Sequence, residues 1–96
     1  MSPRFTWDHD KAAANQNKHG VSFEEAQTVF DNSLAVIFDD EAHSDVEPRE
    51  IIIGHSARNR LLVVCFTERA DSIRIISARR ATTKERRDYE EGTGFR

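Results

Sequence analysis

The feature that most constrains the fold is a set of three apolar runs in the second half of the chain, at residues 49–57, 60–68 and 72–79. Each run is dense in β-branched or aromatic residues and therefore predicts a β-strand. In the middle run both alternating sets of side chains are apolar. These two sets are Leu62, Val64 and Phe66, and Leu61, Val63 and Cys65. Such a strand is buried on both faces, so the predicted sheet needs cover on two sides.

A fourth strand is predicted at residues 34–40, before an acidic loop at 41–48 that contains Pro48. The stretches 58–59 and 69–71 are short enough to be hairpin turns. We therefore expect a four-stranded antiparallel sheet whose strands follow one another in chain order.

Two helices are expected before the sheet. Asp8 is the predicted N-cap of the first helix, and Gly20 is the left-handed residue just past its end. Ser22 and Glu25 have the spacing of a capping box for a second helix, which stops near Asn32. These helices can shield one face of the sheet.

The last helix follows the fourth strand. Thr82 and Glu85 repeat the capping-box spacing, and Gly92 marks the end of the helix before a tail at 93–96 that we expect to be mobile. The predicted order is α-α-β-β-β-β-α, an α+β fold in a single domain at residues 1–96. Because one short helix is scant cover for the second face, we infer that a partner chain or self-association buries the remainder. The alternative is that the C-terminal helix suffices.

Composition excludes several classes of protein. Hydrophobic residues make up 38% and charged residues 32%, as in soluble globular proteins, and no apolar run approaches the roughly 20 residues of a membrane span. Residues 1–10 lack the pattern of a secretory signal and Cys65 is the only cysteine, so a cytoplasmic protein is expected. The scattered histidines predict no metal site, and no cofactor is predicted. These histidines are His9, His19, His43 and His55.

Charge is distributed unevenly along the chain. Residues 1–48 contain 3 Lys/Arg against 10 Asp/Glu, whereas residues 49–96 contain 11 against 7. A basic half suggests a surface that binds a polyanion, although the two halves could also pair with each other inside the fold. Both interpretations remain open at this point.

The predicted hairpins gather arginines at one edge of the sheet. If Ala57 pairs with Arg60, then Arg49 lies opposite Glu68, and the end of the fourth strand lies beside the start of the third. The cations that would share this edge are Arg58, Arg60, Arg79 and Arg80.

The last helix begins at the same edge, where its free N–H groups and Lys84 add positive charge. This arrangement predicts an anion site, most plausibly for a phosphodiester. The alternative is that the basic side chains are solvated and pair with Glu85, Asp88 or Glu90. His55, near this edge, is a candidate general base, although a histidine on a strand more often only packs.

The blocks "KHGVSFEEA" (18–26), "TER" (67–69) and "ISARRATTKERRDY" (76–89) occur in an order and at separations that resemble the BrnT toxins of bacterial type II toxin-antitoxin systems. The resemblance covers nearly the whole chain. It implies a RelE-like fold and a metal-independent ribonuclease that acts on mRNA and halts translation. It also implies a BrnA antitoxin with a ribbon-helix-helix DNA-binding region, which neutralises the toxin in a heterotetramer and represses the shared operon. Operator DNA is then bound only through the antitoxin.

In such a ribonuclease the 2′-hydroxyl of the RNA is the nucleophile, and basic side chains stabilise the charge that develops on the phosphate. The resemblance assigns the transition-state role to Arg79. Arg60 and Arg80 would position the phosphate, His55 is a speculative base, and Arg49 is a secondary candidate. Arg58 and Lys84 would contribute to RNA binding.

Two other functions compete with this one. The first is a catalytically silent module that acts only through its antitoxin complex. The second is an RNA-binding protein without cleavage, which the net charge of −3 disfavours.

Overall fold

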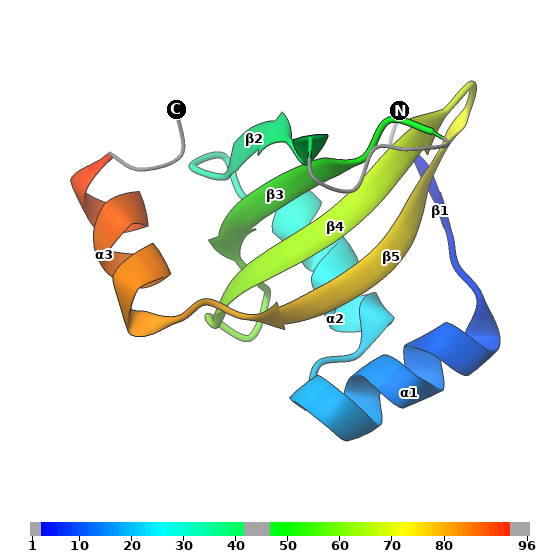
Figure 1. Cartoon of the computed structure of the whole chain (residues 1–96), viewed down its shortest axis with the longest axis horizontal. Helices are drawn as coiled ribbons and strands as arrows, with labels where there is room; N and C mark the ends of the chain where they lie inside the picture. The colour runs from blue at the N-terminus through cyan, green and yellow to red at the C-terminus, as the bar shows by residue number, and fades with distance from the viewer. Residues whose placement is uncertain (1–2, 42–46, 93–96) are drawn as a thin grey trace.

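The sheet has five strands rather than the four expected, in the order β1-β5-β4-β3-β2 (Figure 1). A computed structural model describes residues 3–41 and 47–92, so the predicted tail at 93–96 and most of the loop at 41–48 lie outside the described residues. The strands are β1 (Arg4–Thr6), β2 (Val36–Asp39), β3 (Glu50–His55), β4 (Leu61–Arg69) and β5 (Ser72–Arg80). The four longer strands pair antiparallel in chain order, as predicted.

The additional strand, β1, corrects the prediction of a purely antiparallel sheet. It pairs parallel to β5, with Arg4 opposite Ser72 and Thr6 opposite Arg74. A strand of three residues is too short to show alternation, and its partner lies far away in the sequence. No local pattern could therefore predict it.

The helices begin and end where their capping residues predict. They are α1 (His9–His19), α2 (Phe23–Thr28), which continues into the 3-10 helix η1 (Val29–Asp31), and α3 (Thr83–Glu91). Asp8 caps α1, and Gly20 follows it with a φ of 69°. Thr82 and Glu85 form the predicted capping box at the start of α3. Among the described residues, no helix is long and apolar enough to cross a membrane.

The hairpin between β3 and β4 differs from the prediction by one residue. Ser56 N donates to Arg60 O, and Asn59 adopts a φ of 59°, so the loop has three residues with the last one left-handed. His55 consequently pairs with Leu61. The predicted pairing of Ala57 with Arg60 is therefore wrong, and so is the placement of Arg49 opposite Glu68 that was counted from it.

The two faces of the sheet have different covers. On one face α1, α2 and η1 pack on the larger core, which includes Phe23, Val29, Val64 and Phe66. On the other face a smaller cluster of Ile53, Leu61 and Val63 packs against residues that include Tyr89 of α3. In Figure 1 α2 lies behind the sheet, whereas α3 stands at the end where β5 leads into it. Next to α3 on this second face is the pocket described below, and we call this side the open face.

Strands β4 and β5 are interrupted by a β-bulge. Phe66 pairs with Ile75, but its neighbour Cys65 pairs with Ser77, so Ile76 is an additional residue on β5. A bulge of this kind bends the strand and changes the direction of its side chains. Both Ile76 and Ser77 consequently line the same pocket on the open face.

A buried asparagine fastens α1 to β5. Asn15 is 8% exposed, and its Nδ2 donates to the carbonyls of Val21 (3.0 Å) and Ala78 (2.8 Å). Its Oδ1 accepts from Ala78 N at 3.1 Å. Because β1 pairs with β5 only at residues 72–74, the Asn15 carboxamide pairs with a part of the β5 edge that β1 does not reach. This contact fixes the backbone of the residue directly before Arg79.

Candidate functional site

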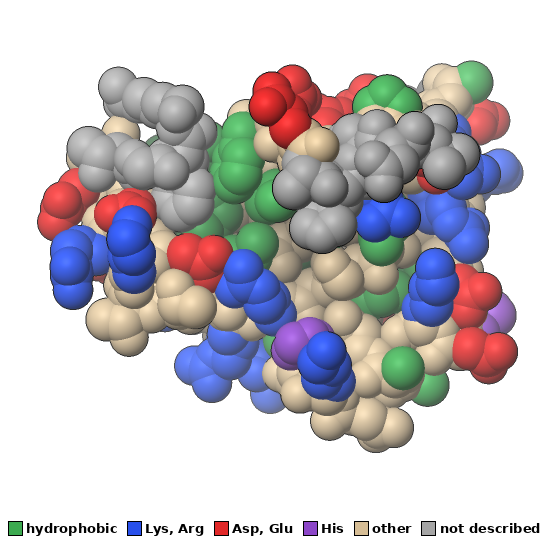
Figure 2. Space-filling view, viewed as in Figure 1, with side chains coloured by type: hydrophobic (Ala, Val, Ile, Leu, Met, Phe, Trp, Pro, Cys, Tyr) green, Lys and Arg blue, Asp and Glu red, His purple; other side chains and the backbone are tan. Residues whose placement is uncertain are grey.

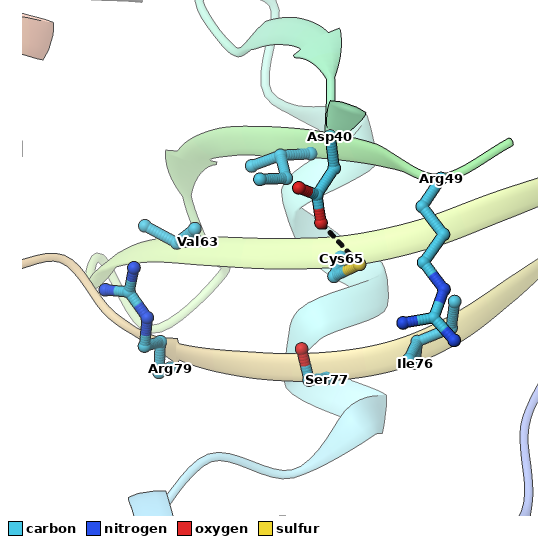
Figure 3. A pocket seen from close by; sticks show the side chains of 8 residues that line it. Asp40, Arg49, Val63, Cys65, Ile76, Ser77 and Arg79 are labelled. Atoms are coloured by element: carbon cyan, nitrogen blue, oxygen red, sulfur yellow. Dashed lines mark hydrogen bonds between the residues drawn. The ribbon is translucent and has the colours of Figure 1, made fainter. Parts of the chain in front are cut away.

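A pocket of about 250 Å³ lies on the open face across β3, β4 and β5 (Figure 3). We call it the open-face pocket. Its lining residues are Asp40, Arg49, Ile51, Val63, Cys65, Ile76, Ser77 and Arg79. In Figure 3 Arg49 and Arg79 lie at opposite ends of this group, with Cys65 and Ser77 on the strands between them. The pocket therefore has a cation at each end and small polar groups on its floor.

The strand register explains why these residues meet. Ile51, Cys65 and Ser77 are direct neighbours across the three strands, and so are Val63 and Arg79 on the adjacent row. Residues two apart on a strand share a face, which puts Ser77 and Arg79 on the same side of β5. Arg49 immediately precedes β3, and Asp40 immediately follows β2.

Arg79 is held by the first turn of α3. Its Nη1 and Nη2 donate to Glu85 Oε1 and Oε2 at 2.7 and 2.9 Å. The same carboxylate accepts from Thr82 N at 2.9 Å and completes the capping box. These contacts, led by the Arg79 guanidinium, lower the pKa of Glu85 to about 2. A paired and capped carboxylate of this kind fixes the direction in which the Arg79 side chain points.

This pairing bears on the choice between an anion site and solvated ion pairs. Arg79 binds Glu85, Lys84 binds Asp88 at 2.8 Å, and Arg86 lies 4.0 Å from Glu90. The pairs of the alternative interpretation are therefore formed. An arginine nevertheless carries five N–H donors, so pairing with Glu85 leaves Arg79 able to donate to a phosphate as well. The Arg79 side chain is 40% exposed, which gives a ligand access to it.

Arg60 and Arg58 do not join Arg79 in one cluster. Arg60 forms a two-pronged ion pair with Glu25 of α2, and its Nη2 also donates to Gly20 O at 3.1 Å. Ser56 Oγ donates to the same carboxylate at 2.7 Å. Arg58 lies 3.8 Å from Glu25. These contacts are with α2, on the face opposite the open-face pocket, so the expected single edge of four arginines is divided between the two faces.

The Glu25 carboxylate is itself buried, at 6% exposure. Hydrogen bonds from the Arg60 guanidinium, which are the largest cause, lower the pKa of Glu25. A buried carboxylate needs such a partner to stay charged. We therefore interpret Arg60 as the side chain that joins the β3–β4 hairpin to α2.

The remaining predicted residues lie around the pocket rather than in it. Arg80 is exposed at the end of β5, and Lys84 is exposed on α3. His55 packs edge to face against Tyr89, with ring centroids 5.9 Å apart. It lines a separate surface hollow formed with residues that include Thr28 and Asn32. The speculative base is therefore outside the lining of the open-face pocket.

Basic side chains are visible over α3 and where β5 leads into it (Figure 2). This surface adjoins the Arg79 end of the open-face pocket. Acidic side chains lie among the basic ones (Figure 2), so these basic groups offer a polyanion individual contacts rather than a net positive field.

Sequence reasoning missed Asp40 and Ser77 as members of the site. Asp40 was assigned to the end of a strand before an acidic loop. Ser77 lies two residues before Arg79 on β5, so strand alternation could have placed it on the same face. Cys65 was predicted only as one of the apolar side chains of a strand buried on both faces. It lines the pocket floor, and burial, as the largest cause, raises the pKa of its thiol to about 11.

Comparison with known proteins gives a consistent result. The family described as "Ribonuclease toxin, BrnT, of type II toxin-antitoxin system" matches residues 7–85. The crystal structure of the Brucella abortus ribonuclease toxin BrnT is similar in fold, with a TM-score of 0.67 and 24% sequence identity. That match covers 85% of this chain and 100% of the Brucella chain. No curated protein matches the sequence.

Proposed function

The chain belongs to the BrnT family of ribonuclease toxins of type II toxin-antitoxin systems, and we propose that its open-face pocket binds and cleaves RNA. The observation that carries this proposal is the pair of arginines at the two ends of the pocket, one of them held in position by Glu85. Guanidinium groups are well suited to phosphate because they donate in a planar fork.

In the proposed reaction the RNA supplies its own nucleophile, the 2′-hydroxyl next to the scissile phosphate. Arg79 donates to the phosphate oxygens and stabilises the negative charge that grows on them in the transition state. Arg49 binds the RNA backbone at the other end of the pocket. In this proposal guanidinium donors take the place of a metal ion in stabilising the charge that grows on the phosphate.

The surface around the pocket extends the proposed contact with RNA. Lys84 is exposed on α3, which follows β5 at the Arg79 end of the pocket, and we propose that it contacts a flanking phosphate. Arg80 is also exposed, but it alternates to the opposite face of β5 from Arg79 and is left out of the proposed contact. Arg58 is 73% exposed but lies near Glu25 on the opposite face, so it is left out of the proposed contact. Arg60 receives a structural role instead, because it lies on the face opposite the pocket, where Glu25 and Gly20 O accept its hydrogen bonds.

A type II system contains a protein antitoxin as well as the toxin. We propose that the antitoxin of this chain is of the BrnA type, with a ribbon-helix-helix region that binds operator DNA on behalf of the complex. The two proteins would form a heterotetramer in the cytoplasm, where mRNA is the substrate. Inhibition of translation follows from loss of the message.

The test is RNA cleavage by the purified chain, freed of antitoxin, with EDTA present. We expect cleavage by the wild type and a loss of about 100-fold or more in Arg79→Ala, because removing one donor to a developing oxyanion typically costs that much. Arg69→Ala is the matched control. Arg69 lies at the far end of β4 in an exposed pair with Glu47, so this variant loses the same charge away from the pocket. Equal cleavage by all three proteins would place the site elsewhere.

One observation favours a second function, a catalytically silent module that acts only in the antitoxin complex. The charge of Arg79 is already balanced by Glu85, as it would be in a surface with no ligand. Expression of the chain alone in cells distinguishes the two functions. Growth arrest that depends on Arg79 supports the ribonuclease, whereas normal growth with a folded wild-type chain supports the silent module.

A further inference from the structure

One side chain in the open-face pocket is suited to accept a proton. Of the eight described residues that line the pocket, Asp40 is the one that carries a carboxylate. We propose that Asp40 is the general base that removes the proton from the 2′-hydroxyl of the RNA. This inference rests on the proposed ribonuclease function and assigns a catalytic role that the sequence had given to His55.

The position of Asp40 is fixed by its neighbours. Its backbone N–H donates to Arg49 O at 2.9 Å, which continues the pairing of β2 with β3 by one residue. The Sγ of Cys65 lies 3.8 Å from Oδ2, so the carboxylate is directed at the pocket floor. Figure 3 shows Asp40 on the β3 side of the pocket, between the ends where Arg49 and Arg79 lie, with its carboxylate directed toward Cys65. Asp40 is half-buried and lines the pocket, so we place the 2′-hydroxyl of a bound RNA beside this carboxylate.

The other polar side chains of the lining are poor proton acceptors. Arg49 and Arg79 are guanidinium ions and act only as donors. The Cys65 thiol has a pKa raised to about 11, chiefly by burial, so it stays protonated near neutral pH. Ser77 is a neutral hydroxyl. A carboxylate is one of the side chains that most often acts as a general base, and Asp40 supplies one in the pocket that Arg49 and Arg79 also line.

The proposed step balances without another reactant except water. The 2′-hydroxyl proton passes to the Asp40 carboxylate, and the 2′-oxygen forms a bond to the adjacent phosphorus. The bond between phosphorus and the 5′-oxygen breaks, and that oxygen takes a proton from water. The hydroxide that remains recovers the proton from Asp40. The products are a 2′,3′-cyclic phosphate and a 5′-hydroxyl end.

Asp40 could also act only as a charge near Arg49, and the test must separate that role from proton transfer. Asp40→Asn removes the base but keeps the shape of the side chain. Asp39→Asn is the matched control. Asp39 is the preceding residue, alternates to the opposite face of the strand and pairs with Glu50 across it.

Three quantities are measured for each variant: the single-turnover rate of RNA cleavage, its dependence on pH, and the Kd for an uncleavable 2′-O-methyl version of the same oligonucleotide. We expect Asp40→Asn to cleave about 100-fold or more slowly, with a Kd within about threefold of wild type. Its rate should rise about tenfold per pH unit, since hydroxide then replaces the missing base. Asp39→Asn should cleave at the wild-type rate.

Two results would overturn the role of Asp40. One is cleavage by Asp40→Asn at close to the wild-type rate. The other is a loss of cleavage that a weaker Kd accounts for in full, which would make Asp40 a positioning residue for Arg49. If Arg79→Ala cleaves RNA at the wild-type rate, the conclusion is different, because that result would reject the proposed pocket itself.

Discussion

Asn15 fixes the backbone of the residue before Arg79, and its contribution to stability can be measured directly. Replacing it with alanine removes three hydrogen bonds and leaves Val21 O, Ala78 O and Ala78 N without that partner. Val21 is 0% exposed and Ala78 is 1% exposed, so water does not easily replace the lost amide. Each buried group left unsatisfied costs about 1–3 kcal/mol. Alanine favours the helix by about 0.5 kcal/mol relative to asparagine.

We therefore expect Asn15→Ala to lower the free energy of unfolding by about 3 kcal/mol, allowing for some relaxation around the site. For a domain of this size the same change lowers Tm by at least about 12 °C. Urea unfolding at constant m-value and thermal unfolding both measure it. Asn17→Ala is the control, because Asn17 is exposed on the same helix and gains only the helix propensity of alanine. A difference below about 1 kcal/mol between the two variants would refute the reasoning.

The remaining predictions concern two other positions. Glu85→Gln should lower the free energy of unfolding by about 1–2 kcal/mol at pH 6, a value reduced from the linkage estimate because Arg79 is partly exposed. Since the pKa of Glu85 falls from 4.5 to about 2 on folding, its contribution is complete above pH 4.5 and is lost as the pH falls toward 2. Urea unfolding of both proteins across that range should show the two curves converging, and a constant difference would contradict the prediction. Gly54→Ala should destabilise by about 1–3 kcal/mol, because the new Cβ would lie 2.7 Å from the Cβ of Ala35. Unchanged stability in urea would show that the segment around Ala35 moves away without cost.

The caps and the main strands could be predicted because their signals are local. An N-cap oxygen and the N–H that it accepts from lie three residues apart in the sequence, as in Asp8 with Lys11 and Thr82 with Glu85. The continuous apolar run in β4 likewise indicated burial on both faces. These features depend on neighbouring residues and are the same in any fold that contains them.

The site was only partly predictable because its residues meet through register. Arg79 and Arg49 were both proposed from sequence, but a three-residue hairpin loop in place of a two-residue one changed the alignment of β3 with β4. The division of Arg60 from Arg79 follows from the buried Glu25, whose carboxylate was expected only to cap a helix. A shift of one residue exchanges the two faces of a strand, so errors of this size decide which charges lie together.

The parallel pairing of β1 with β5 also has a consequence for the order in which the protein is completed during its synthesis. Arg4 cannot pair with Ser72 until Ser72 has been synthesised. At about 5 to 20 residues per second this delay lasts roughly 3 to 14 s. Arg79 and Glu85 are made later still. Most of the nascent chain is therefore synthesised before the pocket can form. The pairing of β1 with β5 occurs at nearly the same stage of synthesis as the placement of Arg79.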